Sequence, residues 1–161
     1  MKQQSIINRY LLAKPNIIFM IGFLIILSTG ILGEIFNWTK IPFSPYSNII
    51  GGIIAFSGWI LHLYCHRTHR QAHKKSQHIN KIVTTGIFSK IRHPMYLGII
   101  ITYFGLAIAW GILWMLIPAI LFSLLAALVS IKEEEYLLQK FGIEYKEYMQ
   151  KVPWRFIKKI F

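Results

Sequence analysis

Three consecutive glutamates, at positions 133–135, form the densest group of carboxylates in the chain. They follow an uncharged stretch that ends at Ile131, so they lie where a membrane helix would reach the polar phase. Neighbouring residues are about 100° apart around a helix, so at least one of these carboxylates is expected to face the protein. A buried carboxylate needs a cationic partner or strong hydrogen-bond donors. Two interpretations remain open: a functional carboxylate, and a solvated helix segment neutralised by Lys132 and Lys140.

A second polar cluster is the sequence Arg-His-Pro-Met-Tyr at positions 92–96. Pro94 suits the first turn of a helix, where its missing N–H costs nothing. His93 would then lie beside a helix N-terminus, which favours an anionic group such as a ligand carboxylate. Gly98, one turn later, would let another group approach the backbone closely. The alternative is a capped membrane helix with a tyrosine at the interface.

Histidines spaced by four, three and four residues start at His62 and share one helical face. A metal site on this face would use His66, His69 and His73. We expect no metal, because no acidic residue accompanies the histidines and His73 lies about 16 Å along the helix axis from His62. The pattern favours a membrane helix that continues into the cytosol with a polar face.

The elements that must position these groups are membrane helices. The chain has 161 residues, of which 55% are hydrophobic and 15% are charged, and its mean hydropathy is +0.48. Soluble domains carry roughly 25% charged residues, so the composition excludes a disordered chain and argues against a soluble one. The uncharged stretch 96–131 is too long for one crossing and predicts a turn near Trp110 and Gly111. We predict an all-α, polytopic bundle with four membrane helices, at 16–34, 48–66, 94–110 and 113–131.

The basic residues predict how the bundle lies in the membrane. The 18 lysines and arginines exceed the 6 acidic residues and give a net charge of +12. All of the lysines and arginines except Lys40 fall on one side of the predicted helices, which places both termini and the segments 66–93 and 132–161 in the cytoplasm. We assign this charge to anionic lipid headgroups and expect no nucleic-acid partner, because no base-stacking or DNA-reading motif accompanies it.

The chain shows no internal repeat and is predicted to be one domain over 1–161. Its first apolar run is expected to remain as a membrane helix rather than to be removed as a signal peptide. The C-terminal piece is predicted to be helical, broken at Gly142 and ended by Pro153. The tail 154–161 mixes aromatic and basic side chains, a composition typical of an interfacial anchor. One cysteine, Cys65, excludes an intramolecular disulfide.

The segments 82–98 and 133–148 together resemble the isoprenylcysteine carboxyl methyltransferases and the related phospholipid methyltransferases. The family pattern joins Gly-x-aromatic and Arg-His-Pro-x-Tyr-x-Gly through a helical hairpin to Glu-Glu-x-x-Leu-x-x-x-Phe-Gly-x-x-Tyr-x-x-Tyr. Either motif alone would be weak, but both occur here in order and with a hairpin between them. The matching residues are Gly86, Ile87, Phe88, the segment 92–98, Glu133, Glu134, Leu137, Phe141, Gly142, Tyr145 and Tyr148.

The resemblance implies an integral-membrane methyltransferase that moves a methyl group from S-adenosylmethionine to a lipophilic acceptor and releases S-adenosylhomocysteine. No glycine-rich loop after a strand is present, so the resemblance implies a cytoplasmic pocket built from the loop and the C-terminal segment. Arg92, Gly86 and Gly98 are expected to be structural, no metal is implied, and no catalytic residue is assigned. The implied cofactor residues are Lys81, Ile82, Val83 and Phe88 at the adenosine, His93, Pro94, Met95 and Tyr96 at the amino-acid end, and Glu133, supported by Glu134, at the ammonium or ribose.

One departure from the family pattern bears on the acceptor. Prenylcysteine methyltransferases carry an arginine one turn before the glutamate pair, where it binds the substrate carboxylate, and this chain has Val129 there. A lipid amine, a thiol or a carboxylate therefore stays open as the acceptor. The alternatives to a methyltransferase are a sterol-reductase-like enzyme that uses NADPH and a non-catalytic lipid-binding protein. The short, basic-flanked chain favours a prokaryotic plasma membrane over the endoplasmic reticulum.

Overall fold

The computed structural model describes residues 15–68 and 79–159, and this part of the chain is helical with no β-strand. The prediction of an all-α fold is confirmed. Two short 3-10 helices, η2 (Gly86–Ser89) and η3 (Leu113–Met115), interrupt the connections. The α-helices are α2 (Pro15–Ile35), α3 (Tyr46–Thr68), α4 (Pro94–Trp110), α5 (Leu116–Phe141) and α6 (Ile143–Lys151).

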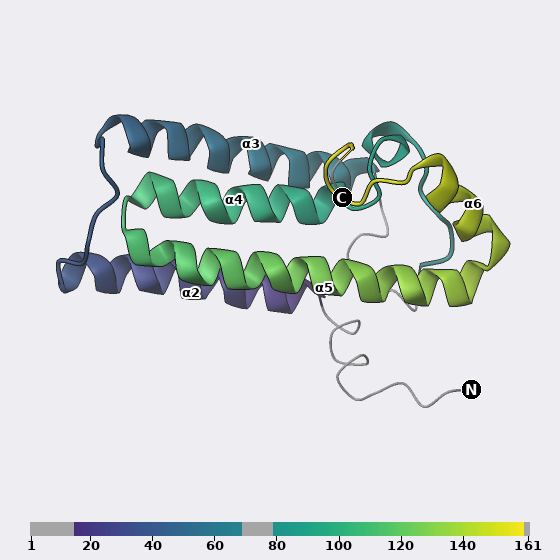
Figure 1. Ribbon diagram of the computed structural model, residues 1–161, viewed down its shortest axis with the longest axis horizontal. Coiled ribbons are helices and arrows are strands. Elements are labelled where there is room, and N and C mark those ends of the chain that lie inside the picture. Colours follow the sequence, from purple (N-terminus) through teal and green to yellow (C-terminus); the bar gives the residue numbers. More distant parts are fainter. Residues whose placement is uncertain (1–14, 69–78, 160–161) are drawn as a thin grey trace, which may run out of the picture.

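The four long helices lie side by side, and α4 lies between α3 and α5 (Figure 1). Helix α2 packs against α5 and α4. Helix α6, the segment that leads into α4 and the described C-terminal residues gather at one end of the bundle, which we call the α6 end. The α2–α3 connection and the α4–α5 turn lie at the opposite end, which we call the Lys40 end.

Three helical segments in the described part of the chain are long and apolar enough to cross a membrane: Ile17–Ile35, Tyr46–Thr68 and Leu113–Phe141. The fourth apolar helix, Pro94–Trp110, has the predicted bounds and 17 residues. At 1.5 Å per residue it is about 25 Å long, near the lower limit for a crossing. The predicted polytopic bundle is therefore found, and α5 continues as one helix beyond the predicted end at 131.

Two glycines with positive φ end helices where the sequence predicts breaks. Gly111 has φ 83° and caps α4, and Gly142 has φ 56° and separates α5 from α6. A residue with a Cβ adopts this conformation at a cost, so glycine fixes both boundaries. At the Lys40 end, the amide of Ile41 donates to the carbonyl oxygen of Gly111 (2.7 Å), and that of Leu113 donates to Thr39 (2.9 Å). These bonds tie the α2–α3 connection to the α4–α5 turn.

Helices α3 and α4 approach each other through glycines. A Cβ on Gly98 would lie 2.8 Å from the carbonyl oxygen of Gly58, and one on Gly51 would overlap the backbone nitrogen of Ala109. Small residues at such contacts let helix backbones pack closely in a membrane. The expectation that something approaches the backbone at Gly98 is confirmed, and the approaching group is helix α3.

Alanine at Gly51 is expected to lower the free energy of unfolding by about 1–3 kcal/mol, the usual cost of overpacking. At the neighbouring Gly52, no atom lies within 4 Å of the place that a Cβ would take, so Gly52→Ala is the matched control. That control is expected to be neutral or slightly stabilising, because alanine favours the helix. Thermal unfolding of both variants in detergent measures the difference, and equal melting temperatures would contradict the packing argument.

Candidate functional site

The carboxylate of Glu134 is the centre of a buried ionic network at the α6 end. Glu134 is 2% exposed. Its Oε1 accepts a hydrogen bond from Nε of Arg92 (2.6 Å) and lies 3.0 Å from Nε2 of His93. Its Oε2 accepts from Nε of Arg155 (2.9 Å). One carboxylate therefore joins the start of α4, the C-terminal part of α5 and the chain after α6.

The chain after α6 also binds the start of α4 through its backbone. The amide of Arg92 donates to the carbonyl oxygen of Trp154 (2.9 Å), and the amide of His93 donates to that of Arg155 (2.8 Å). The Nη1 of Arg92 donates to the carbonyl oxygen of Val152 (2.7 Å). These bonds give Arg92 a structural role, as the family resemblance implies.

Glu133 has a different environment from Glu134. Its Oε2 accepts a hydrogen bond from the hydroxyl of Tyr96 (2.6 Å) and lies 3.9 Å from Nδ1 of His93. Its side chain is 17% exposed, and it forms no salt bridge with a lysine or arginine of the described residues. Glu133 therefore presents a partly accessible carboxylate with no such salt bridge in the described part of the chain.

Helix geometry explains how the two glutamates come to face one histidine. His93 precedes α4 as its N-cap, Pro94 is the first helical residue, and the rings of His93 and Tyr96 stack at 5.5 Å with 3° between their planes. Glu133 and Glu134 are adjacent on α5, so they point in directions about 100° apart and reach the two nitrogens of the same imidazole. The next residue, Glu135, is exposed and pairs with Lys132. The solvated interpretation therefore holds for Glu135, and the expectation that one of the three carboxylates faces the protein is confirmed for Glu134.

The segment that the resemblance implies at the adenosine of the cofactor packs against α6 and the end of α5. Ile82 is buried in an apolar cluster with Leu137, Tyr145, Tyr148 and Val152. Burial and the charges of Glu134 and Glu133 raise the pKa of Tyr145 well above its usual value. Leu137 lies one turn after Glu133 and Glu134 on α5, so the cluster adjoins the two carboxylates.

The other three residues implied at the adenosine differ in burial and in hydrogen bonding. Phe88 is buried, and its carbonyl oxygen accepts a hydrogen bond from the hydroxyl of Tyr148 (2.7 Å). Burial raises the pKa of Tyr148, which keeps this hydroxyl protonated as a donor. Lys81 is exposed and Val83 is half-buried, and neither joins the hydrogen bonds around the two glutamates within the described chain.

The residues after Pro153 contact the groups of the site. The resemblance implies a pocket that includes the C-terminal segment, but no residue beyond Pro153 is predicted to take part. Phe156 is 7% exposed and packs with Phe19, Tyr96 and Val129. The prediction of an interfacial anchor is therefore wrong for Phe156, whose ring is inside the protein. No local pattern distinguishes the two cases, because a segment at the membrane interface and a segment buried in the protein can both combine aromatic with basic residues.

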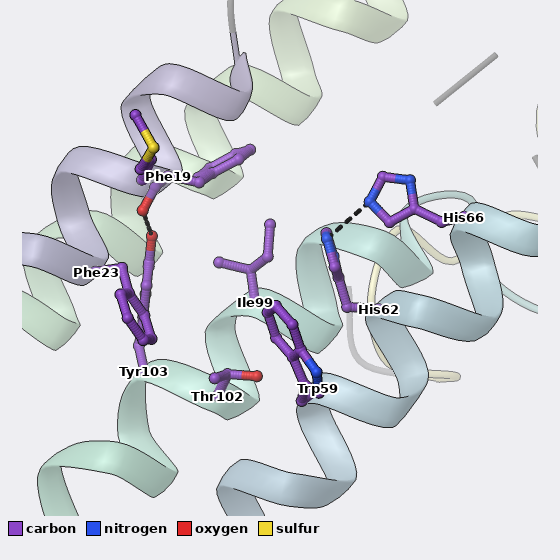
Figure 2. A pocket seen from close by; sticks show the side chains of 9 residues that line it. Phe19, Phe23, Trp59, His62, His66, Ile99, Thr102 and Tyr103 are labelled. Atoms are coloured by element: carbon purple, nitrogen blue, oxygen red, sulfur yellow. Dashed lines mark hydrogen bonds between the residues drawn. The ribbon is translucent and has the colours of Figure 1, made fainter. Parts of the chain in front are cut away.

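A cavity of about 340 Å³ lies between α2, α3 and α4 (Figure 2). It adjoins the glutamate site through two contacts. Nδ1 of His62 lies 3.3 Å from the carbonyl oxygen of Met95, and the rings of Phe19 and Tyr96 are 5.2 Å apart. The walls are mainly apolar, and the lining residues are Phe19, Met20, Phe23, Trp59, His62, His66, Ile99, Thr102 and Tyr103.

The described residues contain no group of three or more histidine, cysteine or acidic side chains that could hold a metal ion. Two members of the predicted histidine set, His69 and His73, lie outside the described residues. His62 and His66, which are described, face the cavity and contact each other.

Curated relatives match parts of this chain. It is 36% identical over 90 residues to protein-S-isoprenylcysteine O-methyltransferase B of Arabidopsis thaliana, covering 53% of this chain and 44% of the relative. It is 34% identical over 74 residues to the protein-S-isoprenylcysteine O-methyltransferase of Schizosaccharomyces pombe, covering 45% and 31% of the two chains. A delta(14)-sterol reductase of Mus musculus is 31% identical over 87 residues, covering 50% and 20%. The chain thus spans less than half the length of these relatives.

The sequence model of the phospholipid methyltransferase family matches residues 46–144 of this chain. This stretch runs from the start of α3 to the start of α6 and makes up more than half of the chain. It contains the His93–Tyr96 stack, both glutamates of the site and the α3 and α4 walls of the cavity. The chain belongs to the phospholipid methyltransferase family.

Proposed function

We propose that this protein is a membrane methyltransferase that uses S-adenosylmethionine and methylates a lipophilic acceptor. The observation that carries the proposal is the environment of Glu133. Its carboxylate is partly accessible, is held by the hydroxyl of Tyr96 and lacks a lysine or arginine partner among the described residues. Such a carboxylate suits a ligand ammonium group, which would form a charge-assisted hydrogen bond with it.

The residues around Glu133 fit the remaining parts of this cofactor. When bound, S-adenosylmethionine supplies a methyl group on a positively charged sulfur. Glu133 would hold its ammonium or ribose, and Glu134 would position His93 rather than bind the ligand directly, because its own oxygens contact Arg92, His93 and Arg155. The other residues proposed to line the cofactor are Pro94, Met95 and Tyr96 at the amino-acid end, and Lys81, Ile82, Val83 and Phe88 at the adenosine.

The cavity between α2, α3 and α4 is the proposed acceptor site. Its mainly apolar walls suit a hydrocarbon chain, and it adjoins the glutamate site at Met95 and Tyr96. Val129, at the position where prenylcysteine methyltransferases carry an arginine, is fully buried beside Tyr96 and Phe156. An apolar side chain there gives a substrate carboxylate no cationic partner, so we favour a lipid amine, a thiol or another neutral nucleophile.

We place the α6 end in the cytoplasm, because the lysines and arginines of the described residues, with the exception of Lys40, lie toward that end of the helices. Both termini are then cytoplasmic, and the cofactor is reached from the cytosol while the acceptor comes from the bilayer. The same charge pattern in a short chain favours a prokaryotic plasma membrane.

Calorimetric titration of the detergent-purified protein with S-adenosylhomocysteine tests the proposed function. We expect saturable binding near one molecule per chain and no binding of NADPH. Absence of S-adenosylhomocysteine binding in a folded, monodisperse sample would contradict the proposal. Binding of NADPH in its place would favour the reductase alternative.

A further inference from the structure

Two histidines form a hydrogen-bonded pair in the wall of the cavity (Figure 2). The Nε2 atoms of His62 and His66 are 2.8 Å apart, and their rings meet nearly edge to face with an interplanar angle of 81°. The two hydroxyl groups in the cavity lining are bonded within the protein. The hydroxyl of Thr102 donates to the carbonyl oxygen of Gly98, and that of Tyr103 donates to the carbonyl oxygen of Phe19. The pair therefore supplies the basic nitrogen atoms of the cavity lining.

The backbone fixes which nitrogen of His62 is basic. The carbonyl oxygen of Met95 can only accept a hydrogen bond, so the Nδ1 that faces it at 3.3 Å carries the proton. The Nε2 of a neutral His62 then has the lone pair, and it accepts from the protonated Nε2 of His66. A base held at Nδ1 by an acceptor and presenting Nε2 is the arrangement that general-base catalysis uses.

We propose that His62 accepts the proton that the nucleophile of the acceptor loses during methylation. The inference rests on the proposed methyl transfer and deepens it. The acceptor's lone pair forms the new bond to the methyl carbon, whose former bonding pair stays on the sulfur. The proton on the nucleophile passes to Nε2 of His62, so the positive charge ends on an imidazolium that Met95 stabilises through Nδ1–H. A nucleophile without a proton, such as a carboxylate, would not need this group.

His66 has a different, positioning role in this scheme. Nε2 of His62 has one lone pair, so the N–H, S–H or O–H of the acceptor must take the place that His66 now holds. Until then, His66 keeps that lone pair hydrogen-bonded in a mainly apolar cavity, where an unmade bond would be costly. The two histidines therefore predict different effects when each is replaced.

A lipophilic para-nitrophenol tests the proton transfer without the cofactor, because its phenolate is yellow and its phenol is not. The probe carries a long alkyl chain and is mixed with detergent-purified protein at a pH where the probe alone is mostly protonated. We expect the wild-type protein to convert bound probe to phenolate. In His62→Gln the ratio of phenolate to phenol should fall roughly tenfold or more, equal to one unit in the probe's pKa.

His66→Gln should retain most of the phenolate, since the base is still present, and Tyr64→Phe, an exposed change on the same helix, should match the wild type. Loss of phenolate in His66→Gln but not in His62→Gln would overturn the assignment of the base. A colourless probe in the wild-type protein, bound or unbound, would overturn the proposal as a whole. S-adenosylhomocysteine affinity is measured on the same samples, and its absence in the wild type would instead reject the methyltransferase function.

Discussion

Replacing Glu134 with glutamine is expected to lower the free energy of unfolding by about 3–5 kcal/mol, the usual cost of breaking a buried ion pair. The carboxylate is 3% exposed as a side chain, and its partner Arg92 is 5% exposed. A neutral amide would leave the guanidinium of Arg92 without a counter-charge in a buried site, beside His93 and near Arg155. The amide has one acceptor oxygen in place of two, so the hydrogen bonds from Arg92 and Arg155, which go to separate oxygens of Glu134, cannot both be kept.

The neighbouring Glu135→Gln is the matched control for Glu134→Gln. Glu135 is half exposed and forms an i,i+3 pair with Lys132, so its removal is expected to cost no more than about 1 kcal/mol. Unfolding of both variants by sodium dodecyl sulfate in mixed micelles, followed by tryptophan fluorescence, gives the two costs. If the costs were equal, the network around Glu134 would not be a main support of the α6 end.

The helices are predictable from the sequence because their causes are local. Uncharged apolar stretches define α2, α3 and α4, and Gly111 and Gly142 mark the ends of α4 and α5. Each of these signals depends on residues close together in the chain. The predicted bounds of α4 are therefore confirmed.

The site depends on contacts between distant residues, and the sequence predicts it less completely. Adjacent glutamates must differ in environment, but which one is buried depends on how α5 is rotated against α4, a result of packing along the whole bundle. The pairing of Arg155 with Glu134 and the burial of Phe156 need the chain after α6 to return to α4. His62 likewise faces a cavity only because residues of α2 and α4 form the other walls of that cavity.

Glutamine at position 133 is expected to weaken S-adenosylhomocysteine binding by about 10- to 100-fold. The substitution keeps the shape of the side chain and an oxygen that accepts from Tyr96, but it removes the negative charge. A hydrogen bond to a charged group contributes about 1.5–3 kcal/mol, and about 1.4 kcal/mol is a factor of ten in affinity. Calorimetric titration of the wild type and the variant under identical conditions measures the change.

Together, Glu133→Gln and Glu134→Gln separate ligand binding from structural support. Because Glu133 is partly exposed and lacks a lysine or arginine partner within the described residues, its replacement should leave the unfolding free energy within about 1 kcal/mol of the wild type. Glu134→Gln should show the large stability loss, and any loss of affinity there should follow from the displacement of His93. A variant at Glu133 that unfolds readily but still binds S-adenosylhomocysteine at wild-type affinity would reverse the two roles and remove the proposed cofactor site from this carboxylate.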